Sequence, residues 1–103
     1  MAQRIIVYWR DIPAQVIVRE GRRAEKRELP ERFIQAVDRA AMRAGARDSD
    51  AYLAEWRRGT PAPCGDDLAA AAEAAVAELV AAYDAARLDA LVRAGGHEPP
   101  KDA

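Results

Sequence analysis

The chain has 103 residues, a formal net charge of −1 and one cysteine. This length suits a single domain with a modest core, and one cysteine excludes a disulfide within the chain. No stretch approaches the ~18 consecutive apolar residues of a membrane-spanning helix, and the apolar run of residues 5–9 is too short for a secretory signal. We therefore expect a cytoplasmic protein that does not insert into a membrane and has no targeting segment.

The charges are unevenly distributed along the chain. Residues 1–59 hold 13 Arg and Lys against 9 Asp and Glu, whereas residues 60–103 hold 3 against 8. Such an asymmetry favours two halves that attract each other, and the alternative is a pair of surfaces that face different partners.

Two short segments near the N-terminus are typical of β-strands. Residues 4–9 (RIIVYW) and 15–20 (QVIVRE) are rich in β-branched and aromatic side chains. Asp11 and Pro13 between them favour a turn, because Asp can bond to its own backbone and Pro fixes φ. We therefore predict an antiparallel β-hairpin over residues 4–20.

Both faces of this hairpin are apolar. In strand alternation one face carries Ile5, Val7 and Trp9, and the other carries Ile6 and Tyr8. The hairpin must therefore be sandwiched between other elements, or it must offer one face to a partner. A third short strand over residues 26–29 is possible, although charged residues dominate that stretch.

Three helices are expected after the hairpin. The first spans about residues 30–44, with proline near its start, Gly45 just past its end and apolar residues at helical spacing. The second covers AYLAEWRR (51–58), with a capping cluster of Asp48, Ser49 and Asp50 before it. A linker, GTPAPCG (59–65), then leads to a long alanine-rich helix from Asp66 to about Arg93.

The long helix carries two apolar faces. Its first part has one stripe, but Leu88, Leu91 and Val92 fall on a rotated face. The helix therefore bends near residues 84–87, or its end packs on a different surface. The rotated stripe could equally cover the domain or receive a partner. The order of elements predicts one α+β domain over residues 1–94, in which helices pack on a small antiparallel sheet, followed by a flexible tail over residues 95–103.

Trp9, Arg10 and Asp11 are the first candidates for a site. A tryptophan face and an arginine fork can bind a planar or anionic ligand. The alternative, which we favour, is a hairpin end in which Trp9 packs on a helix and Arg10 pairs with Asp11 or a neighbouring carboxylate.

Catalytic and metal motifs are not found. Cys64 is the best nucleophile, but the chain's single histidine, His97, is the only base of its kind and lies in the tail. One Cys and one His cannot form a structural zinc site, and no phosphate-binding or dinucleotide glycine pattern occurs. We therefore expect no cofactor and no metal, and the sequence favours a role other than catalysis.

The basic segment REGRRAEKRE (19–28) resembles a nucleic-acid-binding stretch, since arginines neutralise phosphates and nearby aromatics stack on bases. Glutamates interrupt the run, however, and the whole chain is slightly acidic. A solvated hairpin tip is the favoured interpretation, and no DNA is expected as a partner.

Tyr52 and Trp56 form an aromatic pair at helical spacing, with Arg57 beside them. Aromatic side chains and Arg are enriched at the centres of protein interfaces. The alternative is that the pair covers the domain's own sheet.

Three motifs together resemble a known family. VYWRDIPAQVIV, ELPERFIQAVDRAAMRAG and DSDAYLAEWRR, in this order, resemble a small bacterial domain family called the virulence factor domain. It is similar to a segment of conserved virulence factor C proteins, where it accompanies helical repeats. The resemblance is strong over residues 3–58 and looser over 59–92. It implies no reaction and no catalytic residue, because the name is historical. Its stand-alone members are associated with folate-linked and corrinoid methyl transfer, which implies an accessory subunit.

The sequence therefore predicts a small accessory or protein-interaction subunit. Its partner would be another protein, by hetero-association or self-association, and one-carbon metabolism enzymes are the candidates that the resemblance implies. The predicted surface combines the hairpin end with the second helix: Trp9, Arg10, Asp11, Tyr52, Trp56 and Arg57. The alternative is a ligand-binding or catalytic component of a folate- or corrinoid-linked system, in which the same arginines bind a carboxylate or phosphate.

Overall fold

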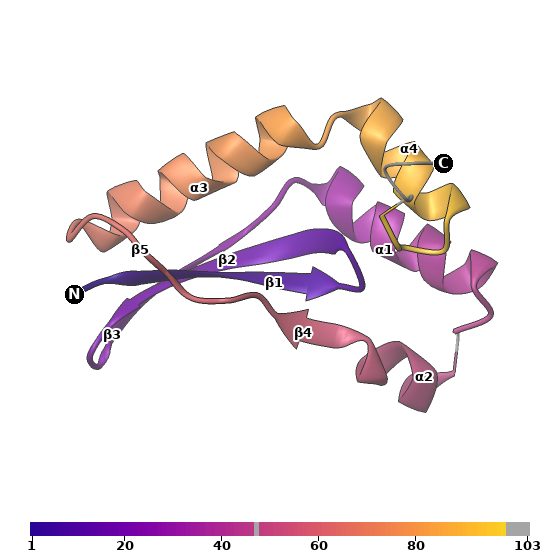
Figure 1. Cartoon of the computed structure of the whole chain (residues 1–103), viewed down its shortest axis with the longest axis horizontal. Helices are drawn as coiled ribbons and strands as arrows, with labels where there is room; N and C mark the ends of the chain where they lie inside the picture. Colours follow the sequence, from indigo (N-terminus) through magenta and orange to yellow (C-terminus); the bar gives the residue numbers. More distant parts are fainter. Residues whose placement is uncertain (47, 99–103) are drawn as a thin grey trace.

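The computed structural model describes residues 1–46 and 48–98 of the chain. Within these residues, the strands and helices form the α+β fold that the sequence predicts (Figure 1). The elements are β1 (Gln3–Trp9), β2 (Ile12–Glu20), β3 (Arg23–Glu28), α1 (Glu31–Arg43), α2 (Ser49–Ala54), β4 (Trp56–Arg58), β5 (Ala62–Pro63), α3 (Leu68–Ala82) and α4 (Ala85–Arg93).

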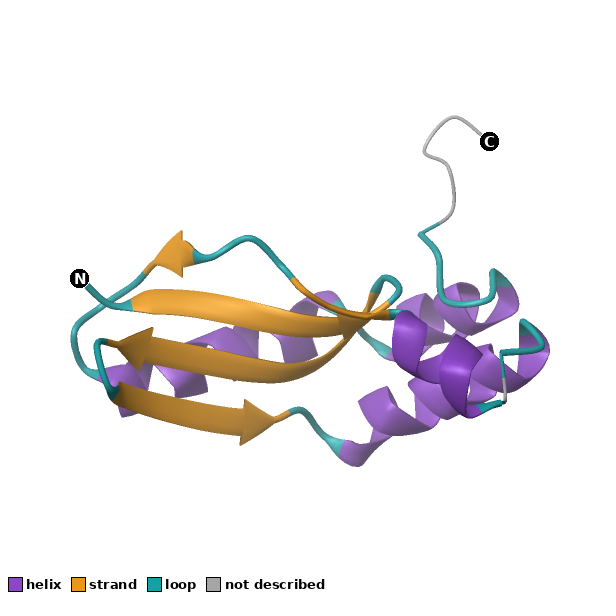
Figure 2. Cartoon of the chain, turned by 90° about the horizontal axis from the view of Figure 1, so that it is seen from below, coloured by secondary structure: helices purple, strands orange, loops and turns teal. Residues whose placement is uncertain are grey.

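The sheet is antiparallel, with the order β3-β2-β1-β4, and β5 also pairs with β1. Val16 and Val18 belong to the same core cluster as the buried residues of α3, so their face of the sheet is the one that α3 covers. Figure 2 shows the sheet from the other side, with α3 behind it and no helix in front of the strands. The third strand expected from the sequence is confirmed, and it is longer than predicted.

The hairpin turn is tighter than the sequence predicts. β1 ends at Trp9 and β2 begins at Ile12, so only Arg10 and Asp11 form the turn. Pro13, which we predicted within the turn, lies in β2 opposite Tyr8, beside an irregularity in the register. Proline is tolerated at such an irregularity because the missing N–H interrupts a ladder that is already broken there. Arg10 instead makes the turn, with a φ of 52°.

The first helix is confirmed and forms the centre of the domain. α1 buries Phe33, Ala36, Val37, Ala40 and Ala41, which recur at the three- and four-residue spacing of one helix face. It packs against the far part of the hairpin on one side and against α4 on another (Figure 1).

The second helix is shorter than predicted. α2 ends at Ala54, and Trp56 and Arg57, which we placed on that helix, lie in β4 beside the end of β1. Asp48 caps α2 as expected, because its side chain accepts a hydrogen bond from the backbone N–H of Ala51 at 3.0 Å. The stretch 59–65, predicted as a linker, includes the short strand β5.

The predicted long helix is two helices. α3 ends at Ala82, and a break at Tyr83 and Asp84 separates it from α4. Asp84 begins the second helix by accepting a hydrogen bond from the N–H of Arg87 at 2.8 Å. This break turns the rotated stripe of Leu88, Leu91 and Val92 into the core, where all three are buried. The stripe therefore covers the domain itself.

The basic and acidic parts of the chain attract each other across the fold. Among the described residues, three arginine–carboxylate ion pairs join the two parts: Arg4–Glu78 at 3.0 Å, Arg27–Glu73 at 2.7 Å and Arg39–Asp89 at 3.2 Å. All three are solvent-exposed, so each contributes little to stability. Within residues 1–46 and 48–98, no helix is both long enough and apolar enough to cross a membrane.

Candidate functional site

The structure brings the six predicted site residues together at one end of the sheet. Trp9, Arg10 and Asp11 lie at the hairpin end, and Trp56 pairs with Trp9 across the β1–β4 ladder. Trp9 is 0% exposed, and its indole Nε1 donates a hydrogen bond to the carbonyl oxygen of Tyr52 at 2.9 Å. Trp9 therefore supports this end of the domain from inside, as in the interpretation that we favoured from the sequence.

Arg10 occupies a strained turn position that its side chain secures. Its positive φ is a conformation that L-residues other than glycine rarely adopt. The guanidinium lies 5.0 Å from the centre of the Trp9 ring, donates to the carbonyl oxygen of Gly95 at 2.7 Å and pairs with Glu55 at 3.5 Å. Its Nε is buried and has no hydrogen-bond partner within the described part of the chain.

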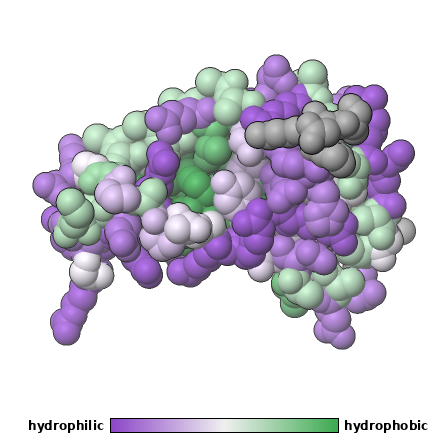
Figure 3. All heavy atoms as spheres, viewed as in Figure 1, coloured by the Kyte–Doolittle hydropathy of each residue, from purple (hydrophilic) through white to green (hydrophobic). Residues whose placement is uncertain are grey.

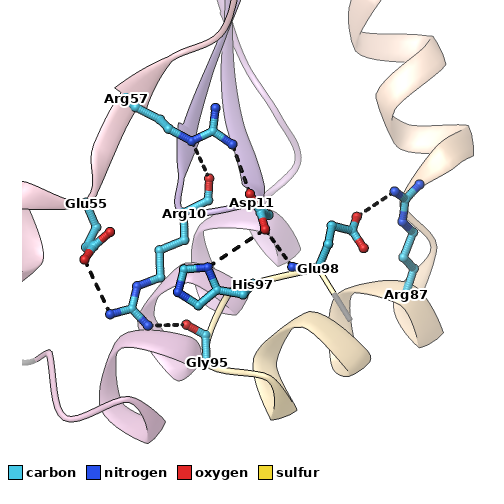
Figure 4. Close-up of polar contacts among 8 residues, drawn as sticks. All are labelled: Arg10, Asp11, Glu55, Arg57, Arg87, Gly95, His97 and Glu98. Carbon is cyan, nitrogen blue, oxygen red and sulfur yellow. Dashed lines mark hydrogen bonds and ion pairs between the residues drawn. The ribbon is translucent and has the colours of Figure 1, made fainter. Parts of the chain in front are cut away.

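Asp11 and Arg57 form the second pair at the hairpin end (Figure 4). Arg57 Nη2 lies 3.0 Å from Asp11 Oδ1, and Arg57 Nε donates to the backbone oxygen of Arg10 at 3.0 Å. The Arg57 guanidinium also lies 4.6 Å from the centre of the Tyr8 ring. Nε and Nη2 of Arg57 are thus bonded within its own chain.

The segment after α4 closes over this pair. The N–H of Asp11 donates to the oxygen of Gly96 at 2.8 Å, and Asp11 Oδ2 accepts a hydrogen bond from the N–H of Glu98 at 2.6 Å. His97 Nδ1 lies 3.9 Å from the same carboxylate oxygen. The structure describes the predicted flexible tail only as far as Glu98, and the rest of it lies outside the described residues. Its mobility stays a prediction.

We call Arg10, Asp11, Arg57 and residues 95–98 the hairpin-end cluster. Figure 4 shows that its charged groups point toward one another and toward backbone oxygens. Both arginines that could hold an anionic ligand are therefore paired with internal carboxylates and carbonyl oxygens. The cluster holds the segment after α4 against the hairpin turn.

Tyr52 and Trp56 continue from the buried Trp9 toward the surface. The rings of Trp9 and Tyr52 stack with centres 5.9 Å apart, and those of Tyr52 and Trp56 meet edge to face at 5.9 Å. Tyr52 and Trp56 are both half-buried. Burial, and to a smaller extent the charge of Asp38, raises the pKa of the Tyr52 hydroxyl.

A pocket of about 420 Å³ lies beside Trp56, where the sheet meets the start of α1. Its apolar walls include Val7, Trp56 and Ile34, and Glu28 and Glu31 are its charged residues. Val7 points to the sheet face opposite α3, since it alternates with Ile6, whose partner Val16 lies in the core. Ile34 is 40% exposed.

A second, more open pocket of about 430 Å³ lies one turn further along α1. It is lined by Asp38, Ala41, Met42 and Tyr52. Ile34 and Asp38 are four residues apart on α1, and Tyr52 touches Trp56, so the two pockets are neighbours, although no residue lines both. We call the two together the α1 groove.

Sequence reasoning found two walls of this groove, Tyr52 and Trp56, and missed Val7, Ile34 and the acidic residues. Ile34 was assigned to the apolar stripe of the first helix, but it lies at the edge of that stripe and stays exposed. The signal available in the sequence was an apolar stripe on the first helix that is wider than the face the helix buries.

Figure 3 shows a second apolar area, a small hollow between α3 and the strands. Apolar residues of these elements that are only partly buried against the core include Ile6, Val76, Leu79 and Val80. The hollow is where α3 and the sheet meet incompletely, and polar surface surrounds it in Figure 3.

Cys64 and His97, which would have to meet to act as a catalytic pair, lie far apart. Cys64 lies next to β5, where its N–H donates to the oxygen of Ala2, whereas His97 contacts Asp11 beyond the other end of β1. Seven strand residues separate the two places, or about 20 Å. In the described parts of the chain, no group of three or more His, Cys, Asp or Glu side chains is placed to hold a metal ion.

The profile of the family described as "Virulence factor" matches residues 7–92, which is most of the chain. No curated protein and no solved structure matches this chain.

Proposed function

We propose that this chain, which belongs to the virulence factor family, is a small cytoplasmic accessory subunit that binds another protein and has no catalytic activity of its own. The observation that supports this proposal is the α1 groove. It leaves Val7, Ile34 and Trp56 around an apolar pocket, and two of the exposed large apolar side chains, Ile34 and Met42, line its two pockets. Exposed apolar surface of this kind is typical of protein interaction sites.

The charges around the groove favour a protein over a small anionic ligand. A site for a carboxylate or phosphate needs convergent arginines, but neither pocket of the groove is lined by Arg or Lys. Arg10 and Arg57, the two arginines of the predicted site, pair with Glu55 and Asp11. A folate- or corrinoid-linked role is therefore not the one we propose.

A pull-down from the native cell tests the proposal. Tagged wild-type chain is compared with Ile34→Ser, which removes the exposed apolar wall of the groove, and with Leu53→Ser as a matched control. Leu53 is 63% exposed and lines neither pocket of the groove. Mass spectrometry should identify a protein that is retained by the wild type and by Leu53→Ser but is depleted with Ile34→Ser.

Circular dichroism of each variant checks that the fold is intact. If no protein is specifically retained by the wild-type chain, or if both variants retain it equally, the proposal is wrong.

A further inference from the structure

The α1 groove carries negative charge along its whole length. Glu28 and Glu31 line its first pocket, and Asp38 lines its second. All three are exposed, and none of them forms an ion pair with another residue of the ranges 1–46 and 48–98. Elsewhere on the molecule most carboxylates are paired or cap a helix, so these three are unusual in facing an apolar surface without a counter-charge.

We infer that the α1 groove binds a positively charged amphipathic helix of a partner protein. This inference rests on the proposed function and specifies the chemistry of the partner. Apolar side chains of the helix would fill the two pockets, and its Lys or Arg residues would face Glu28, Glu31 and Asp38.

The spacing of the pockets fits a helix. Ile34 at the first pocket and Asp38 at the second are separated by one turn of α1, or about 6 Å. On a bound helix, side chains at positions i and i+4 are separated by about the same distance. A helix lying along α1 can therefore place one apolar side chain in each pocket, which is the usual way an amphipathic helix occupies a groove.

Basic residues on this face of the sheet do not line the groove. Arg58 is paired with Val7 in the ladder and Lys26 lies opposite Ile17, so both are on the same sheet face. Neither lines a pocket. The side of the groove formed by α1 carries only acidic charges at its exposed positions beside the pockets: Glu31 and Asp38.

Tyr52 responds to this negative charge. Tyr52 lines the second pocket, and burial, with a smaller contribution from the Asp38 carboxylate, raises the pKa of its hydroxyl. A cationic side chain placed beside Asp38 would instead lower the pKa of the Tyr52 hydroxyl.

The same charges disfavour the other occupants of the groove. In a two-fold symmetric dimer the same surface meets itself, so Glu28, Glu31 and Asp38 would face carboxylates of the second copy. Nucleic acid would bring phosphates against the same residues. A cationic helix is the occupant whose binding both the apolar walls and the acidic residues favour. The acidic residues would contribute chiefly to the selectivity and the association rate.

A binding assay with a defined probe tests the inference. The probe is a synthetic stapled helix that carries two leucines at i and i+4, flanked by lysines, and the matched probe replaces every lysine by glutamate. Fluorescence anisotropy measures the binding of each probe to the whole chain. The chain should bind the lysine probe and not the glutamate probe, and raised salt should weaken the binding.

Two variants with the same charge change distinguish the groove from the overall charge. Asp38→Lys reverses a charge in the groove, and Asp66→Lys reverses an exposed charge in the loop before α3. Asp38→Lys should weaken binding of the lysine probe at least about fivefold, and Asp66→Lys by less than about twofold. A third variant, Ile34→Ser, should also weaken binding, because it removes the apolar wall.

Equal effects of Asp38→Lys and Asp66→Lys, or equal binding of the two probes, would overturn the inference. These outcomes are distinct from failure of the proposed function. If Ile34→Ser loses a cellular partner but the lysine probe does not bind at the groove, the chain has a partner of different chemistry. If no cellular partner is found and the lysine probe does not bind, both proposals are wrong.

Discussion

The hairpin-end cluster and the α1 groove lie on either side of Trp56 and Tyr52, yet they differ in what they leave available. In the hairpin-end cluster, Arg10, Asp11 and Arg57 are rich in functional groups, and nearly all of these groups are bonded within the chain. In the groove, most of the walls are apolar. Ile34 is exposed there, and the acidic residues are unpaired within the described residues.

The difference shows that residues typical of a site need not form one. The charge and the positive φ of Arg10 are typical of a functional residue. Its contacts with Gly95, Glu55 and the Trp9 ring, however, account for its position. Backbone strain at a turn is expected to persist where surrounding contacts fix it. The groove, in contrast, contains an apolar surface that nothing in the described chain covers.

The largest expected effect is on the stability of the hairpin end. Trp9→Ala should lower the free energy of unfolding by about 3–5 kcal/mol, because it leaves a cavity and removes the bond to the Tyr52 oxygen. In a domain of this size that lowers Tm by more than about 12 °C. Trp56→Ala, at a half-buried position, is the control and should cost clearly less. Urea denaturation that ranks the two variants in the opposite order would contradict the assignment of Trp9 to the core.

The next effect concerns the chain after α4. A chain that ends at Ala94 loses the bonds from Gly95 and Gly96 to Arg10 and Asp11, and it should be less stable by about 2–3 kcal/mol. A chain that ends at Glu98 keeps every described contact and is the reference. Thermal unfolding of both chains measures the difference. Equal stability would show that the hairpin end does not depend on this segment.

A smaller effect is expected from one methyl group at the same place. In Gly96→Ala the new Cβ would lie 2.9 Å from an atom of the Trp9 ring, and the residue has a φ of +96°. Gly21 also has a positive φ, but nothing lies within 4 Å of its Cβ position. Gly96→Ala should therefore cost about 2 kcal/mol and Gly21→Ala about 1 kcal/mol, as measured by urea denaturation. The difference between the two variants reports the close contacts with Trp9 and Arg10 together with the larger φ of Gly96.

The smallest effect on stability is expected in the groove. Ile34→Ser should change the free energy of unfolding by less than about 1 kcal/mol, because Ile34 is exposed. The same variant should lose the binding described above. Were Ile34→Ser to destabilise the chain as much as Gly96→Ala, the groove would belong to the folding core rather than to an open surface.

Local signals predicted most of the fold. Alternation in β1 and β2, the cap at Asp48 and the buried face of α1 are all encoded by neighbouring residues. Asp84 was also a readable cap, and recognising it would have separated α3 from α4. Trp56 was misplaced because its spacing from Tyr52 matches a helix, whereas its strand pairing with Trp9 depends on a residue far away in the sequence.

The groove could not be predicted from local patterns. Val7, Ile34 and Trp56 come from three elements, and only the packing of α1 against the hairpin decides that they line one pocket. The hairpin-end cluster was predicted in part, since Arg10, Asp11 and Arg57 were all named. The contribution of residues 95–98 was missed, because a glycine-rich C-terminus without apolar residues gives no signal of docking.

The two tryptophans provide the most direct test of the account, because one lies in each region. The indole N–H signals of Trp9 and Trp56 can be observed by NMR in the ¹⁵N-labelled chain and assigned with Trp56→Phe. On addition of the stapled lysine probe, the Trp56 signal should shift with saturation, and the Trp9 signal, which is buried and bonded to Tyr52, should move little. A probe that binds but shifts Trp9 more than Trp56, or leaves both unchanged, would contradict the groove as the docking surface.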